Sequence, residues 1–236
     1  MNMTEKHPSK DYLRLHNEGL LSTGMTVAVS AHLEFCGQCR DESRSMVDDL
    51  ARQWCADDVP ASSMGDLAAG DVDSLLSQIT SQLQETEEVV ERYDQSGSGY
   101  ELHMHERSVK LPGVLGKIAS NGVVWRQLAG GISTAPLSLD REAQCDFMYM
   151  RPGSQVPNHK HQGTEITLVL DGNFFDEMGQ YSPGDFILRN GSHIHTPQSD
   201  EGCLCYTVLD SPLRFTAGWS RLLNPLQSLM FNRGMR

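Results

Sequence analysis

The chain has 236 residues, 39% of them hydrophobic, which is enough for one or two domains with ordinary buried cores. Lys and Arg total 19 against 31 Asp and Glu, and the net charge of -12 argues against direct binding to the phosphate backbone of nucleic acids. No apolar run approaches the roughly 20 residues of a membrane span, and the polar residues 1–12 lack the apolar centre of a signal peptide, so we expect a cytoplasmic protein.

The first 94 residues have the pattern of helices. Ser9 is placed to cap a short amphipathic helix that ends near Gly19. Apolar residues at helical spacing predict two more helices, one over residues 25–35 and one over residues 41–54. We therefore expect a helical domain over residues 1–94.

A fourth helix gives the clearest pattern. Between Ser74 and Tyr93, Leu, Ile and Val recur at intervals of about 3.6 residues among Gln, Glu and Ser. Such an amphipathic helix either packs on its own bundle or offers its apolar face to another protein. The residues alone leave both interpretations open.

The composition changes after this helix. Residues 95–100 are rich in Gly and Ser, which predicts a short flexible linker. Over residues 101–236, Gly, Pro, Asn and Asp separate short apolar runs, a pattern typical of an all-β sandwich or barrel. The runs lie at residues 123–125, 147–150, 166–170, 186–188 and 204–209.

Three metal-binding side chains occur close together in the helical part. His32, Cys36 and Cys39 have the spacing H-x3-C-x2-C. Residues four apart share one face of a helix, so His32 and Cys36 can reach the same ion. A tight turn at residues 37–38, Gly-Gln, is expected to bring Cys39 to the same point.

A tetrahedral structural zinc ion needs one more ligand. His7 is favoured because it precedes the first helix and can fold back, whereas His16 lies within that helix and is the competitor. A C-x2-C pair alone would also suit redox chemistry, but the histidine one helical turn earlier favours zinc. A closed shell of two histidines and two cysteines would hold helices together rather than bind a substrate.

On these residues the helical part resembles the zinc-binding anti-sigma family, in which the same spacing follows an earlier histidine. Members of the family bind an extracytoplasmic-function (ECF) sigma factor and keep it from RNA polymerase. In the family, the last helix of the zinc domain enters between the two sigma domains. The resemblance therefore implies that role for the helix from Ser74 to Tyr93.

The β part contains a second group of metal-binding side chains. His159 and His161 are two residues apart, so on a strand their side chains leave the same face. Glu165 is expected to return to that face after an intervening turn. A fourth ligand should come from a strand that follows a later hairpin turn at residues 183–185, Pro-Gly-Asp.

Two histidines compete for the fourth position. His195 and His193 share one face of the strand that follows the turn, so both are candidates. Three imidazoles and one carboxylate suit zinc, iron, manganese or nickel, and residue type alone does not choose among these metals. An octahedral ion would keep two open positions, whereas the shell of a tetrahedral zinc ion would be full.

The second group, framed by Gly153 and Gly172, resembles the first cupin motif, and the Pro-Gly-Asp turn resembles part of the second. Residues 195–197, His-Thr-Pro, are similar to a segment of ChrR-type anti-sigma factors, which fuse a zinc domain to a cupin. That resemblance selects His195 and covers nearly the whole chain. It implies an α+β multidomain protein, with an N-terminal four-helix zinc-binding anti-sigma domain and a C-terminal all-β cupin (jelly-roll) barrel.

Two further thiols, Cys203 and Cys205, share one face of a late strand. They are either buried structural residues or a redox-sensitive pair that faces the cupin cavity. The sequence does not decide between these roles.

The resemblance implies a cytoplasmic anti-sigma factor that sequesters an ECF sigma factor. Release would follow an oxidative signal of the singlet-oxygen type, sensed through the metal-binding cupin, and the acidic surface suits a basic sigma factor. The alternatives are a cupin-type metal-dependent dioxygenase with a helical appendage, and a metal-binding oligomerisation module. The implied ligands are His7, His32, Cys36 and Cys39 for zinc, and His159, His161, Glu165 and His195 for zinc, iron, manganese or nickel; no catalytic residue is assigned.

Overall fold

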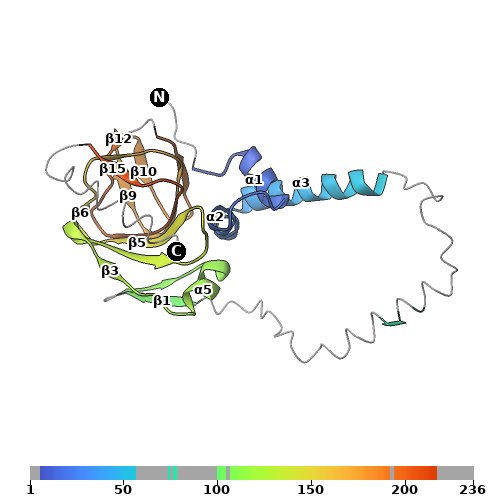
Figure 1. The fold of residues 1–236 in the computed structure, drawn as a ribbon, viewed down its shortest axis with the longest axis horizontal. Helices are drawn as coiled ribbons and strands as arrows, with labels where there is room; N and C mark the ends of the chain where they lie inside the picture. The colour runs from blue at the N-terminus through green and yellow to red at the C-terminus, as the bar shows by residue number, and fades with distance from the viewer. Residues whose placement is uncertain are drawn as a thin grey trace. The chain divides into compact units, whose positions relative to one another are not determined.

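A computed structural model describes residues 6–56 (side chains to residue 54), 74, 77–78, 100–104, 107–191 and 194–216. Figure 1 shows the helices and strands of the described residues. By its contacts the chain divides into two units. The first combines residues 1–47 with residues 99–236, and the second comprises residues 48–98. Among the described residues, no helix is both long and apolar enough to cross a membrane.

Three helices occupy the described amino-terminal residues: α1 (Lys10–Asn17), α2 (Thr23–Phe35) and α3 (Gly37–Ala56). The cap predicted for α1 is confirmed, because the Ser9 side chain accepts a hydrogen bond from the backbone N–H of Tyr12 at 3.3 Å. Only Cys36 separates α2 from α3, in an extended conformation. The tight turn predicted at residues 37–38 is therefore wrong, since both residues already belong to α3.

Most of the predicted fourth helix lies outside the described residues. Ser74, Ser77 and Gln78 are helical, as the pattern predicts. The predicted domain boundary at residue 94 and nearly all of the linker at residues 95–100 also lie outside the described residues, so both stay predictions.

The remainder of the described chain is mainly β structure, as predicted. A small hairpin pairs β1 (Glu101–Met104) with β2 (Arg107–Lys110), and a short helix, α5 (Gly113–Ala119), follows it. Sequence analysis does not predict α5, because Pro112-Gly113 at its start is typical of a turn. The apolar run at residues 123–125 is not a strand; the neighbouring β3 (Arg126–Gln127) is.

Beyond the small hairpin, the described part of the β domain forms three antiparallel sheets. The six-stranded sheet has the order β11-β8-β14-β5-β4-β3, the four-stranded sheet β10-β9-β13-β6, and the three-stranded sheet β12-β7-β15. The strands not yet located, with a 3-10 turn η2 (Ala129–Gly131), are β4 (Ile132–Leu137), β5 (Gln144–Met150), β6 (Ser154–Gln155), β7 (His159–His161), β8 (Glu165–Gly172), β9 (Phe174–Asp176), β10 (Gly179–Tyr181), β11 (Phe186–Arg189), β12 (Ile194–His195), β13 (Gln198–Ser199), β14 (Cys203–Leu209) and β15 (Leu213–Phe215).

The Pro-Gly-Asp segment at residues 183–185 is a turn, but not the hairpin turn that the sequence predicts. It joins β10 of the four-stranded sheet to β11 of the six-stranded sheet. Gly184 takes a φ of 91°, which favours glycine, and its N–H donates to the carbonyl of Val169 on β8 at 2.9 Å. The segment is therefore a corner between sheets.

The two faces of the six-stranded sheet bury different clusters. On β14, Cys203 and Cys205 face a cluster shared with residues of the four-stranded sheet, such as Phe174. The alternate residues Leu204, Tyr206 and Val208 belong to a second cluster on the opposite face. This alternation gives the domain an inner core between the sheets and an outer core on the far side of the large sheet.

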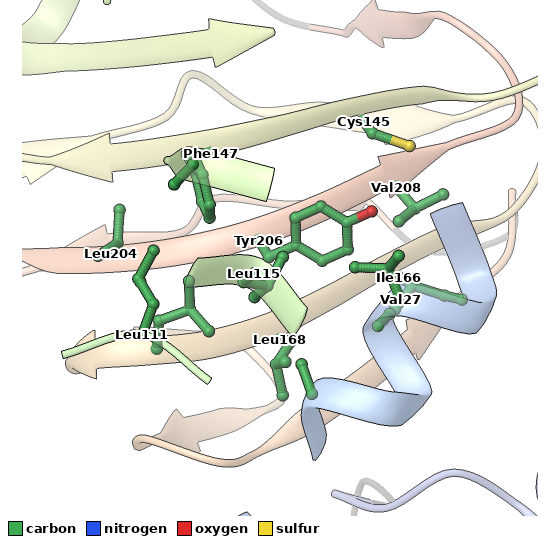
Figure 2. Packing of buried hydrophobic residues seen from close by; sticks show 14 of the residues in the cluster. Val27, Leu111, Leu115, Cys145, Phe147, Ile166, Leu168, Leu204, Tyr206 and Val208 are labelled. Carbon is green, nitrogen blue, oxygen red and sulfur yellow. The ribbon is translucent and has the colours of Figure 1, made fainter. Parts of the chain in front are cut away.

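The outer core also includes the first helices. Val27 of α2 packs with Ile166, Tyr206 and Val208, as Figure 2 shows. The backbone of α2 is held as well, because the Tyr206 hydroxyl donates to the carbonyl of Gly24 at 3.1 Å. Helices α1 and α2 therefore fold as part of the same compact unit as the β domain.

Replacing Tyr206 by phenylalanine removes the hydroxyl but keeps the buried ring. We expect the free energy of unfolding to fall by about 1 kcal/mol, the usual net contribution of one such hydrogen bond. Urea denaturation of the purified chain measures this change. Unaltered stability would contradict the role of this hydroxyl in holding α2.

Candidate metal centres

The first candidate centre consists of His7, His32, Cys36 and Cys39, whose ligand atoms all lie within 4.8 Å of one another. His7 precedes α1, His32 lies in the last turn of α2, and Cys39 lies in the first turn of α3. The Nδ1 atom of His7 is 3.5 Å from the sulphur of Cys36 and 3.5 Å from that of Cys39. The structure thus brings together all four residues that the sequence predicts.

The orientation of His32 is set by the β domain. Its Nδ1 lies 2.8 Å from the backbone carbonyl of Gly184, and because a carbonyl only accepts, Nδ1 carries the proton. The other ring nitrogen, Nε2, is buried and has no hydrogen-bond partner. An unprotonated nitrogen held this way is what a metal ligand requires, and two imidazoles with two thiolates suit tetrahedral zinc.

Burial shifts the pKa of two members of this cluster, His32 and Cys39. It lowers the pKa of His32, which keeps the imidazole neutral. Burial, with the hydrogen bond to Cys36, raises the pKa of Cys39 to about 12. In the metal-free chain this sulphur is therefore a thiol, and a bound metal would have to displace its proton.

His16, the competing fourth ligand, lies elsewhere. Its Nε2 is 2.9 Å from the hydroxyl of Ser30, an interaction that packs α1 against α2. It does not belong to the group of four within the described residues.

The second candidate centre lies in the β domain. β7 carries His159 and His161, and β12 brings His195 opposite His159. The ligand nitrogens of the three imidazoles lie within 4.8 Å of one another, and those of His161 and His195 are 3.0 Å apart. Glu165, the first residue of β8, is not in that group of three, but one of its carboxylate oxygens lies 2.8 Å from Nε2 of His161.

Hydrogen bonds on the far side of two rings fix their orientation. Nδ1 of His159 donates to the carbonyl of Pro157 at 2.8 Å, and Nδ1 of His195 lies 3.2 Å from the carboxylate of Asp176. Both rings therefore direct Nε2 toward the centre. Asp176 is buried and paired with Arg189; sequence analysis does not identify it, since it lies between the two motifs and outside both.

Two side chains of this centre, His159 and Glu165, have strongly shifted pKa values. Burial lowers the pKa of His159 to about 3. Burial disfavours the charged form of Glu165, but attraction by His161 and the hydrogen bond to it bring the pKa of this carboxyl down to about 2. His159 is thus a neutral imidazole and Glu165 a carboxylate, the forms in which these side chains bind metals.

A cavity of about 400 Å³ adjoins the second centre. His159, Glu165 and His195 form part of its wall. Most of the rest is apolar and includes Ile132, Met148, Met150, Val156, Phe174 and Phe215. A metal ion held here would face a space large enough for a small, largely apolar molecule.

The remaining sequence candidates lie outside the two groups. The sulphur atoms of Cys203 and Cys205 are buried in the inner core, 3.4 Å apart. Within the described residues, neither cysteine lines the cavity. His103 is exposed on β1, while His193 lies outside the described residues. The role of the two thiols stays open between the structural and redox hypotheses.

Comparison with known proteins gives a consistent answer. Residues 117–211 match the family described as ChrR cupin-like domain. The anti-sigma-E factor ChrR of Cereibacter sphaeroides is 29% identical over 226 residues, which span 94% of this chain and 98% of that protein. The chain is therefore similar to an anti-sigma factor of the ChrR type along nearly its whole length.

A solved structure extends the match to three dimensions. The crystal structure of Rhodobacter sphaeroides SigE in complex with the anti-sigma ChrR matches with a TM-score of 0.63 and 25% identity. The match covers 87% of this chain and 98% of the solved chain. The cupin fold and the preceding helices are therefore both shared with a known anti-sigma protein, and the fold predicted from the sequence is confirmed.

Proposed function

We propose that this chain is an anti-sigma factor that binds an ECF sigma factor and releases it when its cupin domain senses an oxidative signal. The observation that carries the proposal is the similarity to ChrR along 94% of the chain, because it includes the helical part as well as the cupin. A dioxygenase with a helical appendage would need only the cupin. We therefore favour a regulator over the enzyme.

The surface proposed to bind the sigma factor belongs to the helical part. The helix from Ser74 to Tyr93 is proposed as its main element. On α3, the side chains of Val47 and Trp54 are 47% and 73% exposed. These two residues are seven positions apart and so share a face of α3. Large exposed apolar side chains on one face, in a chain of net charge -12, suit a basic protein partner.

We propose zinc for the first centre and zinc, iron, manganese or nickel for the second. Two cysteines and two histidines form a closed tetrahedral set for zinc, which would fix α2 and α3 to the segment before α1. Three histidines and Glu165 accept several divalent metals. This set lies beside the cavity, which suits a sensing role in the cytoplasm, with singlet oxygen or its products as the proposed signal.

Co-expression with the ECF sigma factor encoded nearest to this chain tests the proposal. The two proteins should purify as a complex, and a promoter that depends on the sigma factor should stay silent until an oxidant is added. A His159→Ala variant should still repress but no longer respond, while His103→Ala, which changes an exposed histidine on β1, should behave as wild type. Failure of the two proteins to associate would refute the anti-sigma function.

Asp176 should matter for metal affinity at the second centre although it is not a ligand. Asp176→Asn replaces the charged carboxylate that accepts from Nδ1 of His195 by a neutral amide. The His195 ring is then held less firmly, so we expect metal affinity at the second centre to fall by about 10- to 100-fold. Competition with a chelator of known affinity measures the change. Asp171→Asn is the control, since Asp171 is 41% exposed and pairs with Arg107 away from the centre. Equal affinities for the two variants would contradict this role of Asp176.

A further inference from the structure

We propose that the cupin domain completes the first metal centre, and that strand β11 couples the occupancy of the second centre to the retention of metal at the first. This inference rests on the proposed function, because it supposes that both centres bind metal. It identifies residues 184–189 as the physical connection between the sensing domain and the sigma-binding helices.

The amino-terminal end of β11 is joined to the first centre. The carbonyl of Gly184 accepts the hydrogen bond from Nδ1 of His32 at 2.8 Å, and the ring of Phe186 packs edge-on against that imidazole with 5.8 Å between centroids. The N–H of Phe186 donates to the carbonyl of Lys6 at 2.9 Å, next to His7. Two of the four ligands are thus positioned by the start of this strand.

An ion pair adds to the same connection. The ammonium group of Lys6 lies 2.7 Å from the carboxylate of Asp185. A side chain on Gly184 would lie 2.9 Å from Cβ of Phe35, so the corner and the end of α2 are in close contact. Movement of residues 184–186 would therefore move the groups that hold His7 and His32.

The carboxyl-terminal end of β11 is joined to the second centre. Arg189 is 4% exposed and forms an ion pair with Asp176, which in turn holds Nδ1 of His195 at 3.2 Å. Arg189 also pairs in register with Glu165 of β8. Of the four proposed ligands of the second centre, Glu165 therefore lies beside Arg189 and His195 lies beside Asp176, the ion-pair partner of Arg189.

The short length of β11 makes coupling between its ends physically reasonable. The strand has four residues and so spans roughly 10 Å between its terminal Cα atoms. Both ends are buried, and packed, hydrogen-bonded elements pass on displacements instead of absorbing them. When a metal fixes His195 and Glu165, the Asp176–Arg189 pair is fixed as well, which favours the position of Gly184 that orients His32.

Coupling of this kind is reciprocal and can be measured. If a metal in the second centre stabilises the first, a metal in the first must stabilise the second by the same factor. A purely structural role for β11 predicts instead that each centre loses its metal at a rate independent of the other.

Cobalt makes the two centres distinguishable. Only the first contains cysteines, so absorption from Co²⁺–thiolate bonds reports that centre alone. The full chain is loaded with Co²⁺ at the first centre and Mn²⁺ at the second, and the decay of thiolate absorption is followed in excess chelator. The comparison is His159→Ala, which removes a ligand of the second centre but keeps His195, Asp176 and Arg189. We expect Co²⁺ loss to be about tenfold faster in that variant.

A second set of variants tests the route. In Arg189→Lys the charge stays but the planar group that contacts Asp176 and Tyr181 is lost, so the rate should no longer depend on Mn²⁺. Phe186→Leu, which keeps an apolar side chain of similar bulk but removes the ring contact with His32, should weaken the dependence as well. Leu188→Ala is the control, because this side chain also lies on β11 but is 42% exposed.

The outcomes separate the inference from the proposed function. Equal rates with and without Mn²⁺, in a chain that binds both metals, would overturn the coupling and leave the anti-sigma proposal standing. Failure of either centre to bind metal would overturn the inference together with the metal assignments. Persistence of the dependence in Arg189→Lys and Phe186→Leu would overturn the assignment of β11 as the connection.

Discussion

Replacing Cys39 by serine should lower the metal content of the chain from about two ions to about one and abolish binding of the sigma factor. Cys39 is buried in the first turn of α3, and with Cys36 it supplies the two thiolates that suit zinc. A serine hydroxyl is a poor ligand for this ion. Because structural zinc contributes its binding free energy to folding, α3 should lose its fixed position relative to α2.

Elemental analysis and sigma-factor pull-down measure the two effects. His16→Asn is the matched control, because His16 lies in the same helical part but interacts with Ser30 instead of the cluster. Its metal content and sigma binding should equal those of the wild type. A Cys39→Ser chain that keeps both metals, or that binds the sigma factor as tightly as before, would contradict the proposed role of the first centre.

Replacing Gly24 by alanine should lower the free energy of unfolding by about 3 kcal/mol, near the upper end of the usual cost of overpacking. A Cβ at this position would clash with the sulphur of Cys145 and lie 3.2 Å from Cγ1 of Val208. All three residues lie where α2 packs on the large sheet. The new methyl group would therefore force α2 away from the β domain and strain its hydrogen bond with Tyr206.

A double-mutant cycle identifies the cause. Cys145→Ala removes the sulphur that the methyl group meets, so Gly24→Ala should cost much less in that background. Gly37→Ala is the control on another helix, where the nearest atom to the new Cβ belongs to the flexible side chain of Arg40 at 3.5 Å. Urea denaturation of the four chains gives the coupling energy, and additive effects would show that the contact with Cys145 is not the reason.

The residues of both centres could be predicted because local geometry brings most of them together. His32 and Cys36 are one helical turn apart, and His159 and His161 leave the same face of β7. Only His7 and His195 had to be assigned over longer distances along the chain. His7 was favoured because it precedes the first helix and can fold back, and the resemblance to a known segment selected His195; the structure brings both residues into their groups.

The contacts between the helices and the β domain could not be predicted in the same way. His32 and Gly184 are separated by 152 positions, and Tyr206 and Gly24 by 182. No periodic pattern encodes a hydrogen bond between a side chain and a distant backbone carbonyl. The close packing of Gly24 could not be predicted either, since a glycine within an apolar helix does not indicate that the sulphur atom of Cys145 lies against it.

The position of Cys145 beneath α2 provides an intrinsic probe of the regulatory cycle. Its thiol is 1% exposed, and burial raises its pKa to about 11, so an alkylating reagent should modify it slowly while α2 stays in place. Should the helical part leave the large sheet when it engages a sigma factor, modification of this thiol would accelerate. Peptide mass mapping could then time the rearrangement without an attached dye.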